Sequence, residues 1–145
     1  TAYSPYQAEV SQGTLQYLYE FQTMICELSG MDIANASLYD GASAIAEACL
    51  LSTSVTRKST ILYSSLLNEH YIHVMRSYLR GKDINIVALP MNNGITDLDQ
   101  ITSNYDDLAA IIIQSPNTLG LIEDWELAKE EILKQYKTKN EFLLI

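Results

Sequence analysis

The chain has 145 residues, a usual length for one domain, of which 48% are hydrophobic and 19% charged. Nine Lys and Arg residues against 18 Asp and Glu residues give a formal net charge of −9. The composition excludes a disordered tail, and the charge disfavours nucleic acid and anionic membrane surfaces as partners. No apolar run reaches the roughly 18 residues that cross a bilayer. Because no Lys or Arg precedes Arg57, an anion held by the first third would depend on backbone N–H groups and helix dipoles.

The first residues and the two cysteines indicate whether the chain is part of a longer one and in which redox compartment it folds. The sequence opens at Thr1 without a Met, a basic segment or an apolar segment, so we expect it to be the interior of a longer chain. Cys26 and Cys49 have no CxxC spacing and lie in apolar helical contexts. We interpret both as reduced thiols in a reducing compartment, which favours a cytoplasmic protein.

Two helices are predicted in an N-terminal helical segment, residues 1–56. Apolar residues recur at helical spacing ahead of a glycine, at Leu18, Phe21, Ile25, Leu28 and Gly30. This pattern predicts an amphipathic helix over Thr14–Ser29 that ends at the glycine. A second helix is predicted over Gly41–Thr53, with Asp40 as its N-cap. Its small side chains would let another element approach closely.

Strands and helices alternate in the predicted segment 57–145. Four apolar runs are expected to be strands, at Thr60–Tyr63, Ile84–Leu89, Ala109–Ile113 and Phe142–Ile145. Helices are expected between them, at Asn68–Arg80, Leu98–Ser103 with Asp97 as its cap, and Asp124–Lys137. Strands that are apolar throughout are typical of a parallel sheet covered by helices. We therefore predict an α/β fold, with a three-layer, mostly parallel sheet, in a single domain over 1–145.

The helix over Asn68–Arg80 carries the residues that most resemble metal ligands. Glu69, His70 and His73 follow neither the HExxH pattern nor another dedicated ligand spacing, so we interpret them as solvent-facing and predict no metal site. Its buried face is expected to consist of Tyr71, Met75, Tyr78 and Leu79, with Gly81 ending the helix. The glycines of the chain form neither GxGxxG nor GxxxxGK, so a Rossmann dinucleotide site and a P-loop lack support.

Two turns are candidates for a ligand site. Tyr39-Asp40-Gly41-Ala42-Ser43 runs directly into a helix, whose unpaired N–H groups and positive dipole end would suit a phosphate. Ordinary capping by Asp40 without a ligand is the alternative, and the local sequence favours it. Ile113-Gln-Ser-Pro-Asn117 follows a strand, on the side where open parallel sheets bind ligands. A plain Pro-Asn turn explains this second segment equally well.

Several ordered motifs resemble a known family. Thr1–Gly13, Met24–Ala44, Ile113–Asn117 and Gly120–Asp124 are similar to the P-protein of the glycine cleavage system, most closely to the first, or alpha, subunit of its two-subunit form. The similarity is strongest over 1–49 and 111–124, and elsewhere the α/β rhythm supports it.

The resemblance implies a partial large domain of a fold-type-I pyridoxal-phosphate-dependent transferase, with the remainder of the parent chain missing. P-proteins decarboxylate glycine and pass the aminomethyl group to a lipoyl carrier protein, with pyridoxal phosphate as the electron sink. The alpha chain resembles a degenerate copy, and the beta chain holds the cofactor lysine. The implied partners are the catalytic beta subunit and the lipoyl carrier protein.

The same resemblance assigns the cofactor site. Residues Tyr39, Asp40, Gly41, Ala42 and Ser43 correspond to the phosphate cup of the fold, and we expect low occupancy in this chain. Asn68-Glu69 stands where related alpha subunits have a His-Pro pair, whose counterpart stacks on the cofactor ring; Asn68 cannot stack that way. The Schiff-base lysine and the aspartate that pairs with the pyridinium nitrogen are expected beyond Ile145. We therefore predict no catalytic residue here, and pyridoxal phosphate only in the parent complex.

Two other interpretations remain open. The chain could be a purely structural segment that packs on the beta chain, or a small doubly wound ligand-binding domain unrelated to pyridoxal phosphate. Cofactor binding would distinguish the purely structural segment from a segment of the enzyme. Leaving the apolar side chains of the expected strand Phe142–Ile145 in water would destabilise the fold. We therefore also expect the fragment to form a homo-oligomer through its sheet.

Overall fold

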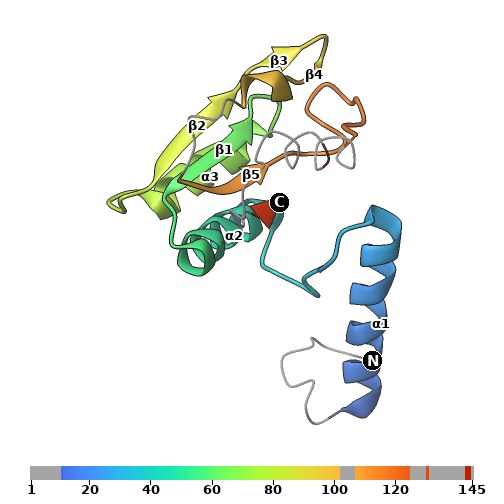
Figure 1. Cartoon of the computed structure of the whole chain (residues 1–145). Coiled ribbons are helices and arrows are strands. Elements are labelled where there is room, and N and C mark those ends of the chain that lie inside the picture. Colours follow the sequence, from blue (N-terminus) through green and yellow to red (C-terminus); the bar gives the residue numbers. More distant parts are fainter. Residues whose placement is uncertain (1–10, 102–106, 125–129, 131–142, 145) are drawn as a thin grey trace. The chain divides into compact units, whose positions relative to one another are not determined.

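A computed structural model describes residues 11–101, 107–124, 130 and 143–144 (Figure 1). The chain divides into two compact units, Thr1–Tyr39 and Asp40–Ile145. In the described ranges, no helix is long and apolar enough to cross a membrane.

Helix α1, Gln12–Ser29, is the main element of the first unit. It begins two residues before the predicted start because Ser11 caps it: the Ser11 hydroxyl accepts a hydrogen bond from the Thr14 N–H at 3.3 Å. It ends as predicted at Gly30, whose left-handed backbone (φ 67°) lets its N–H bond the Cys26 carbonyl at 2.7 Å. No residue of α1 is buried.

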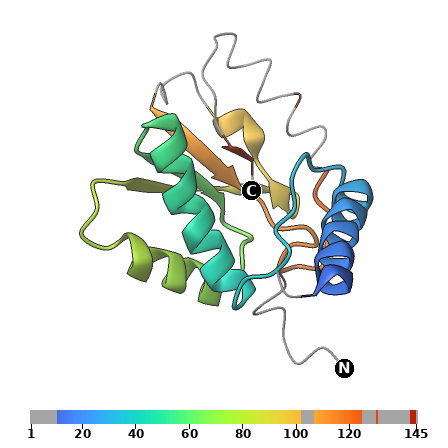
Figure 2. The same cartoon turned by 90° about the horizontal axis from the view of Figure 1, so that it is seen from below.

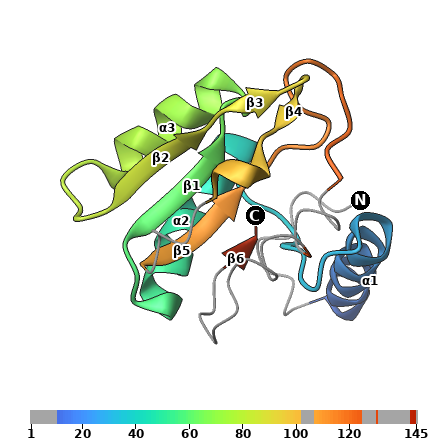
Figure 3. The ribbon, with the colours of Figure 1, turned by 45° about the horizontal axis from the view of Figure 1, so that its top comes forward.

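The second unit is built on a parallel sheet. Its strands are β1 (Thr60–Ser64), β2 (Asn85–Leu89), β5 (Leu108–Ile112) and β6 (Leu143–Leu144), in the order β2-β1-β5-β6 (Figure 3). Every pair in it is parallel. The predicted α/β class with a parallel sheet is confirmed. The central strands β1 and β5 are buried along their whole length, whereas β2 at the edge is partly exposed.

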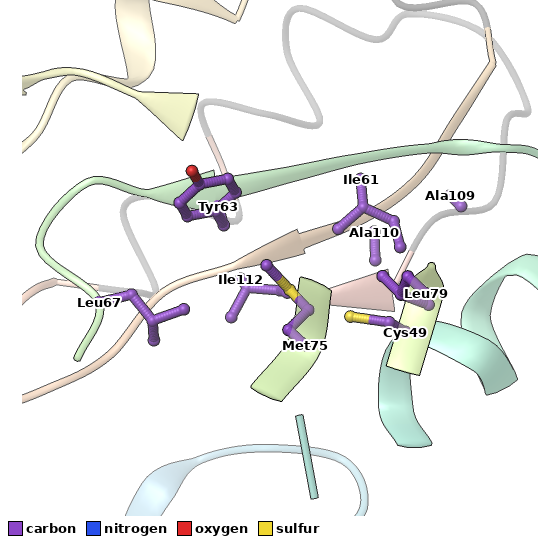
Figure 4. Packing of buried hydrophobic residues seen from close by; sticks show 9 residues of the cluster. All are labelled: Cys49, Ile61, Tyr63, Leu67, Met75, Leu79, Ala109, Ala110 and Ile112. Atoms are coloured by element: carbon purple, nitrogen blue, oxygen red, sulfur yellow. The ribbon is translucent and has the colours of Figure 1, made fainter. Parts of the chain in front are cut away.

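Helices α2 (Gly41–Thr56) and α3 (Glu69–Leu79) lie side by side on one face of the sheet (Figure 2). The core between them and the sheet consists of Cys49, Ile61, Tyr63, Leu67, Met75, Leu79, Ala109, Ala110 and Ile112 (Figure 4). Helix α2 buries only small side chains, Ala42, Ala46, Cys49 and Ser52. The buried face of α2 thus consists of small residues, which allow a neighbouring element to approach its backbone closely.

The other face of the sheet has its own cluster, formed by Leu62, Leu89, Ile101, Leu108 and Ile111. Leu98 packs against it from η2, a 3-10 turn at Leu98–Gln100 that Asp97 caps as predicted. The rest of the predicted helix Leu98–Ser103 lies outside the described residues, apart from Ile101. Of the predicted helix Asp124–Lys137, the structure describes only Asp124 and Glu130, and Glu130 is helical.

Helix α3 follows the prediction with two differences. Asn68 caps it, and its side-chain oxygen accepts a hydrogen bond from the His70 N–H at 2.9 Å. Met75 and Leu79 are buried, but Tyr78 is 44% exposed, so its assignment to the buried face was wrong. The helix ends one residue early, at Leu79 with Arg80 as its C-cap, and Gly81 follows with a positive φ of 78°.

The structure forms a hairpin between β2 and η2, where the sequence pattern predicts no element. Strands β3 (Met91–Asn92) and β4 (Ile95–Thr96) pair antiparallel. Asn93 and Gly94 join them with positive φ angles of 52° and 84°. These are the two residue types that a tight primed turn requires.

Candidate functional site

Three segments meet at the carboxyl edge of the parallel sheet, where open α/β sheets bind ligands. They are the entry to α2 at Asp40–Ser43, the entry to α3 at Asn68–Tyr71, and the turn after β5 at Gln114–Asn117. The Asn68 N–H donates to the Gln114 side-chain oxygen at 2.9 Å, and the Tyr71 ring lies against Gly41. Both turns singled out from the sequence are thus at one edge.

The N-terminus of α2 is capped by its own residues Asp40 and Ser43. The Ser43 N–H and the Ser43 hydroxyl each donate to Asp40 Oδ1 at 2.7 Å. In return, the Asp40 N–H donates to Ser43 Oγ at 3.2 Å, which completes a capping box. A carboxylate therefore already lies at the positive end of the helix.

The charge on this carboxylate is favoured by its surroundings. The hydrogen bond from the Ser43 side chain, followed by that from the Ser43 backbone, lowers the pKa of Asp40 below its usual value. The nearby His70 and the Ala42 N–H act in the same direction. Asp40 thus remains ionised at neutral pH and presents a negative charge to any ligand that approaches α2.

Tyr71 restricts the first residue of α2. A β-carbon built on Gly41 would lie 2.8 Å from the Tyr71 hydroxyl oxygen and 3.0 Å from its Cζ. Tyr39 precedes the Asp40 cap in the sequence, and its side chain is 96% exposed.

The turn Tyr39–Ser43 lacks what a cofactor phosphate needs. A phosphate would need free N–H donors and a positive field, yet the Ser43 N–H is bonded to Asp40, whose carboxylate is negative. The turn and the residues before it contain no Lys or Arg, so this part of the chain supplies no cationic side chain for a phosphate. As it stands, the turn Tyr39–Ser43 does not fit the phosphate of a pyridoxal cofactor.

Lysines are the groups that would bind a cofactor aldehyde. Lys58 lies just before β1 and Lys82 just before β2, so both are at the amino edge of the sheet, opposite the three segments. The other lysines, Lys129, Lys134, Lys137 and Lys139, lie outside the described residues. Of the lysines that the structure places, neither stands near the candidate site.

Gln114 connects two of the three segments. Its side-chain oxygen accepts from the Asn68 N–H, and its side-chain amide donates to the Pro116 carbonyl at 3.0 Å. The Ser115-Pro116 bond is cis. Gln114 thus fixes the start of α3 against the turn after β5, a role that the local sequence did not reveal.

A buried carboxylate near this edge was also missed. Glu123 is 6% exposed, and its Oε1 accepts from the Thr96 N–H (3.2 Å), the Thr96 hydroxyl (3.1 Å) and the Asn117 side-chain amide (2.9 Å). The Thr96 and Ser64 hydroxyl oxygens are 2.7 Å apart. Asn117 also donates to the Gly94 carbonyl at 2.9 Å. These bonds join the β3–β4 hairpin to the loop after β5.

The histidines and cysteines hold no comparable site. His70 and His73 are exposed, and His73 Nε2 lies 3.6 Å from Glu69 Oε1. Within the part of the chain that the structure describes, no group of three or more His, Cys, Asp or Glu could hold a metal. Burial raises the pKa of the Cys49 thiol to about 12, while Cys26 is half-buried; both are free.

Three comparisons with known proteins indicate the same family over most of the chain. A family model described as "Glycine cleavage system P-protein" matches residues 1–143. A probable glycine dehydrogenase (decarboxylating) subunit 1 of Anoxybacillus flavithermus is 49% identical over 124 residues, which cover 85% of this chain and 28% of that protein. The same subunit of Bacillus cereus is 48% identical over 140 residues, covering 95% and 31%.

A solved structure is also similar. The crystal structure of glycine decarboxylase (P-protein) of the glycine cleavage system, in inhibitor-bound form, matches 86% of this chain and 28% of its own, with 45% identity and a TM-score of 0.70. The chain therefore spans less than a third of the length of these relatives.

Proposed function

Since the chain belongs to the glycine cleavage system P-protein family, we propose that it is a segment of an enzyme that decarboxylates glycine and transfers the aminomethyl group to a lipoyl carrier protein. The observation that carries this proposal is the combined match in sequence and fold to a glycine decarboxylase, 45% identity with a TM-score of 0.70 over 86% of the chain. Because the chain spans about 28% of that protein, the activity belongs to the complete protein.

Within that enzyme, the segment is a non-catalytic part of a large domain. Pyridoxal phosphate, bound in the complete complex, supplies the electron sink for glycine decarboxylation. The turn Tyr39–Ser43 keeps the form of a phosphate cup but holds the Asp40 carboxylate in place of a phosphate. Two observations support this role: the bonds from Ser43 to Asp40, and the placement of Lys58 and Lys82 at the opposite edge of the sheet.

The partners of the segment are proposed on the same basis. A catalytic beta chain contributes the cofactor lysine, and the lipoyl carrier protein receives the aminomethyl group. The free thiols of Cys26 and Cys49 support a cytoplasmic protein. As an isolated fragment, the chain associates with itself at β6, an apolar strand at the edge of the described sheet.

The test measures CO2 release from carboxyl-labelled glycine. The complete protein, its partner chain, pyridoxal phosphate and the lipoyl carrier protein are expected to release labelled CO2 together, whereas the segment with the cofactor is expected to release none. Release by the segment alone at the rate of the complete system would overturn the non-catalytic role. No release by the complete system would overturn the proposed activity.

A further inference from the structure

The turn of the β3–β4 hairpin places an asparagine directly before a glycine (Figure 3). Asn93 and Gly94 join the two strands with positive φ angles of 52° and 84°, and Asn93 is exposed to water. Among the residues that the structure describes, none forms a hydrogen bond with the Asn93 side chain. The amide of Asn93 is therefore free to react with its own backbone.

An asparagine amide reacts with the peptide nitrogen of the next residue. When the Gly94 nitrogen attacks the side-chain carbonyl carbon of Asn93, a nitrogen–carbon bond forms and the bond from that carbon to the amide nitrogen breaks. Ammonia leaves and takes the Gly94 amide proton with it, and a five-membered succinimide remains. Water then opens the ring to aspartate or isoaspartate, with no oxidation or reduction. Gly94 has no β-carbon to obstruct the attack.

The other asparagines are less suited to this reaction. Asn93 is the one asparagine in the sequence that precedes a glycine. Asn117 is 5% exposed, and its side-chain amide donates two hydrogen bonds. The side-chain oxygens of Asn35 and Asn68 accept hydrogen bonds from the Ser37 and His70 N–H groups, at 3.1 and 2.9 Å. Sequence and surroundings thus both single out Asn93.

The loop after β5 holds the turn in place. The Asn117 amide donates to the Gly94 carbonyl at 2.9 Å. Leu121 Cδ1 would lie 2.8 Å from a β-carbon on Gly94, so the turn packs against this loop. Closing the succinimide ring requires the Asn93–Gly94 peptide to rotate out of its hairpin conformation. The bond from Asn117 and the contact with Leu121 oppose that rotation.

We propose that Asn93 is a modification site, at which spontaneous deamidation through a succinimide with Gly94 gives aspartate or isoaspartate at a rate that Asn117 limits. Isoaspartate adds one methylene group to the backbone of a two-residue turn, and the pairing of β3 with β4 then fails. Thr96 on β4 consequently loses its hydrogen bonds to the buried Glu123. The modification does not depend on the proposed enzymatic function.

The experiment incubates the full chain at mildly alkaline pH and follows every asparagine by peptide mapping with mass spectrometry. Isoaspartate is identified with an isoaspartyl methyltransferase. Asn93→Gly is the matched control, because Gly-Gly keeps a primed turn and removes the amide. Asn117→Ala and the urea-unfolded wild type both lack the bond to the Gly94 carbonyl, so the result does not depend on whether the variant folds.

We expect the Asn93 peptide to gain about one mass unit before any other asparagine peptide, and Asn93→Gly to lose this early ammonia release. Asn117→Ala and unfolding should each accelerate the reaction at Asn93, roughly two- to tenfold for the loss of one hydrogen bond. Earlier conversion of another asparagine would overturn the site. Equal rates at Asn93 in the native, variant and unfolded chains would overturn the role of Asn117.

Hydrogen exchange at the Thr96 N–H tests the structural consequence. Freshly purified Asn93→Asp carries the aspartate product without the longer backbone, and Asp-Gly is also a primed-turn pair. We expect this variant to protect Thr96 like the wild type, and the isolated isoaspartate form to lose the protection. Unchanged protection in the isoaspartate form would show that the hairpin tolerates the added methylene group and would overturn this consequence.

Discussion

The hydroxyl oxygen of Tyr71 occupies the space beside Gly41, 2.8 Å from where a β-carbon of residue 41 would be. Tyr71 lies in the first turn of α3 and packs against the main core, so the ring is not free to swing away without loss of contacts. The absence of a side chain at residue 41 is therefore what allows the starts of α2 and α3 to lie together.

Gly41→Ala tests this relationship. The added methyl group must displace the Tyr71 ring, and we expect the free energy of unfolding to fall by about 1 kcal/mol. Gly13→Ala is the control, because nothing lies within 4 Å of its β-carbon position; this change should be neutral or stabilising. Denaturant unfolding provides both values. Equal effects of the two substitutions would show that the Tyr71 contact is unimportant.

Asp40 caps α2 and is expected to stabilise it in a pH-dependent way. Because its pKa is lowered in the folded state, its charge stabilises the fold above the usual carboxyl pKa of about 3.9. This contribution is lost as the pH falls through the lowered pKa. Asp40→Asn keeps the cap without the charge, so the difference in melting temperature from the wild type should shrink as the pH falls below about 4.

Asp40→Ala removes the cap as well. We expect its melting temperature at pH 7 to be roughly 3–5 °C below that of the wild type, and lower than that of Asp40→Asn. Calorimetric scans of the three proteins at several pH values measure both effects. A constant difference between wild type and Asp40→Asn from pH 7 to pH 2.5 would contradict the role of the charge.

Glu123 is expected to be essential for the connection between the hairpin and the loop after β5. In Glu123→Gln, an amide N–H2 group replaces one carboxylate oxygen and faces donors from Thr96 or Asn117, so a buried group is left unpaired. We expect a loss of about 1–3 kcal/mol in unfolding free energy. Thr96→Ser, which keeps the hydroxyl, should lose less. Hydrogen exchange at Thr96 would locate the change, and unaltered protection in Glu123→Gln would argue against it.

The two cysteines should differ in reactivity. The Cys49 thiol is buried with a pKa raised to about 12, so little thiolate forms at pH 8, whereas Cys26 is half-buried on α1. We expect an aromatic disulfide reagent to modify Cys26 in the native chain and Cys49 only after unfolding. Peptide mapping identifies the labelled residue. Since the unfolded thiol ionises near pH 8.5, the burial of Cys49 should also destabilise the fold progressively as the pH rises above that value.

The elements with strong local signals were predicted correctly from the sequence. Asp40 and Gly30 mark helix ends through their own backbone and side-chain chemistry, and the apolar run at Ala109–Ile113 predicts β5 within one residue. The β3–β4 hairpin was missed because strands of two residues carry no periodicity, although Asn93-Gly94 is a typical primed-turn pair.

The contacts that shape the site depend on residues far apart in the sequence. Gly41 meets Tyr71 across 30 positions, and Thr96 meets Glu123 across 27. Neither pair has a local pattern, so only the folded chain reveals them. The turn Tyr39–Ser43 shows what the sequence alone cannot decide. Its residues suit both a phosphate site and a helix cap, and the conformation of the Asp40 side chain determines which hydrogen bonds form.

We infer that the cup of this P-protein segment contains its own Asp40 carboxylate rather than a cofactor phosphate. The most direct measurement is a two-dimensional NMR titration of the labelled chain with inorganic phosphate and then pyridoxal phosphate, followed by borohydride reduction and peptide mapping. We predict no saturable shift of the Gly41, Ala42 and Ser43 amides at micromolar ligand, and no single lysine labelled in stoichiometric amount. Saturation of those three amides by micromolar pyridoxal phosphate, with one lysine fully labelled, would contradict the claim.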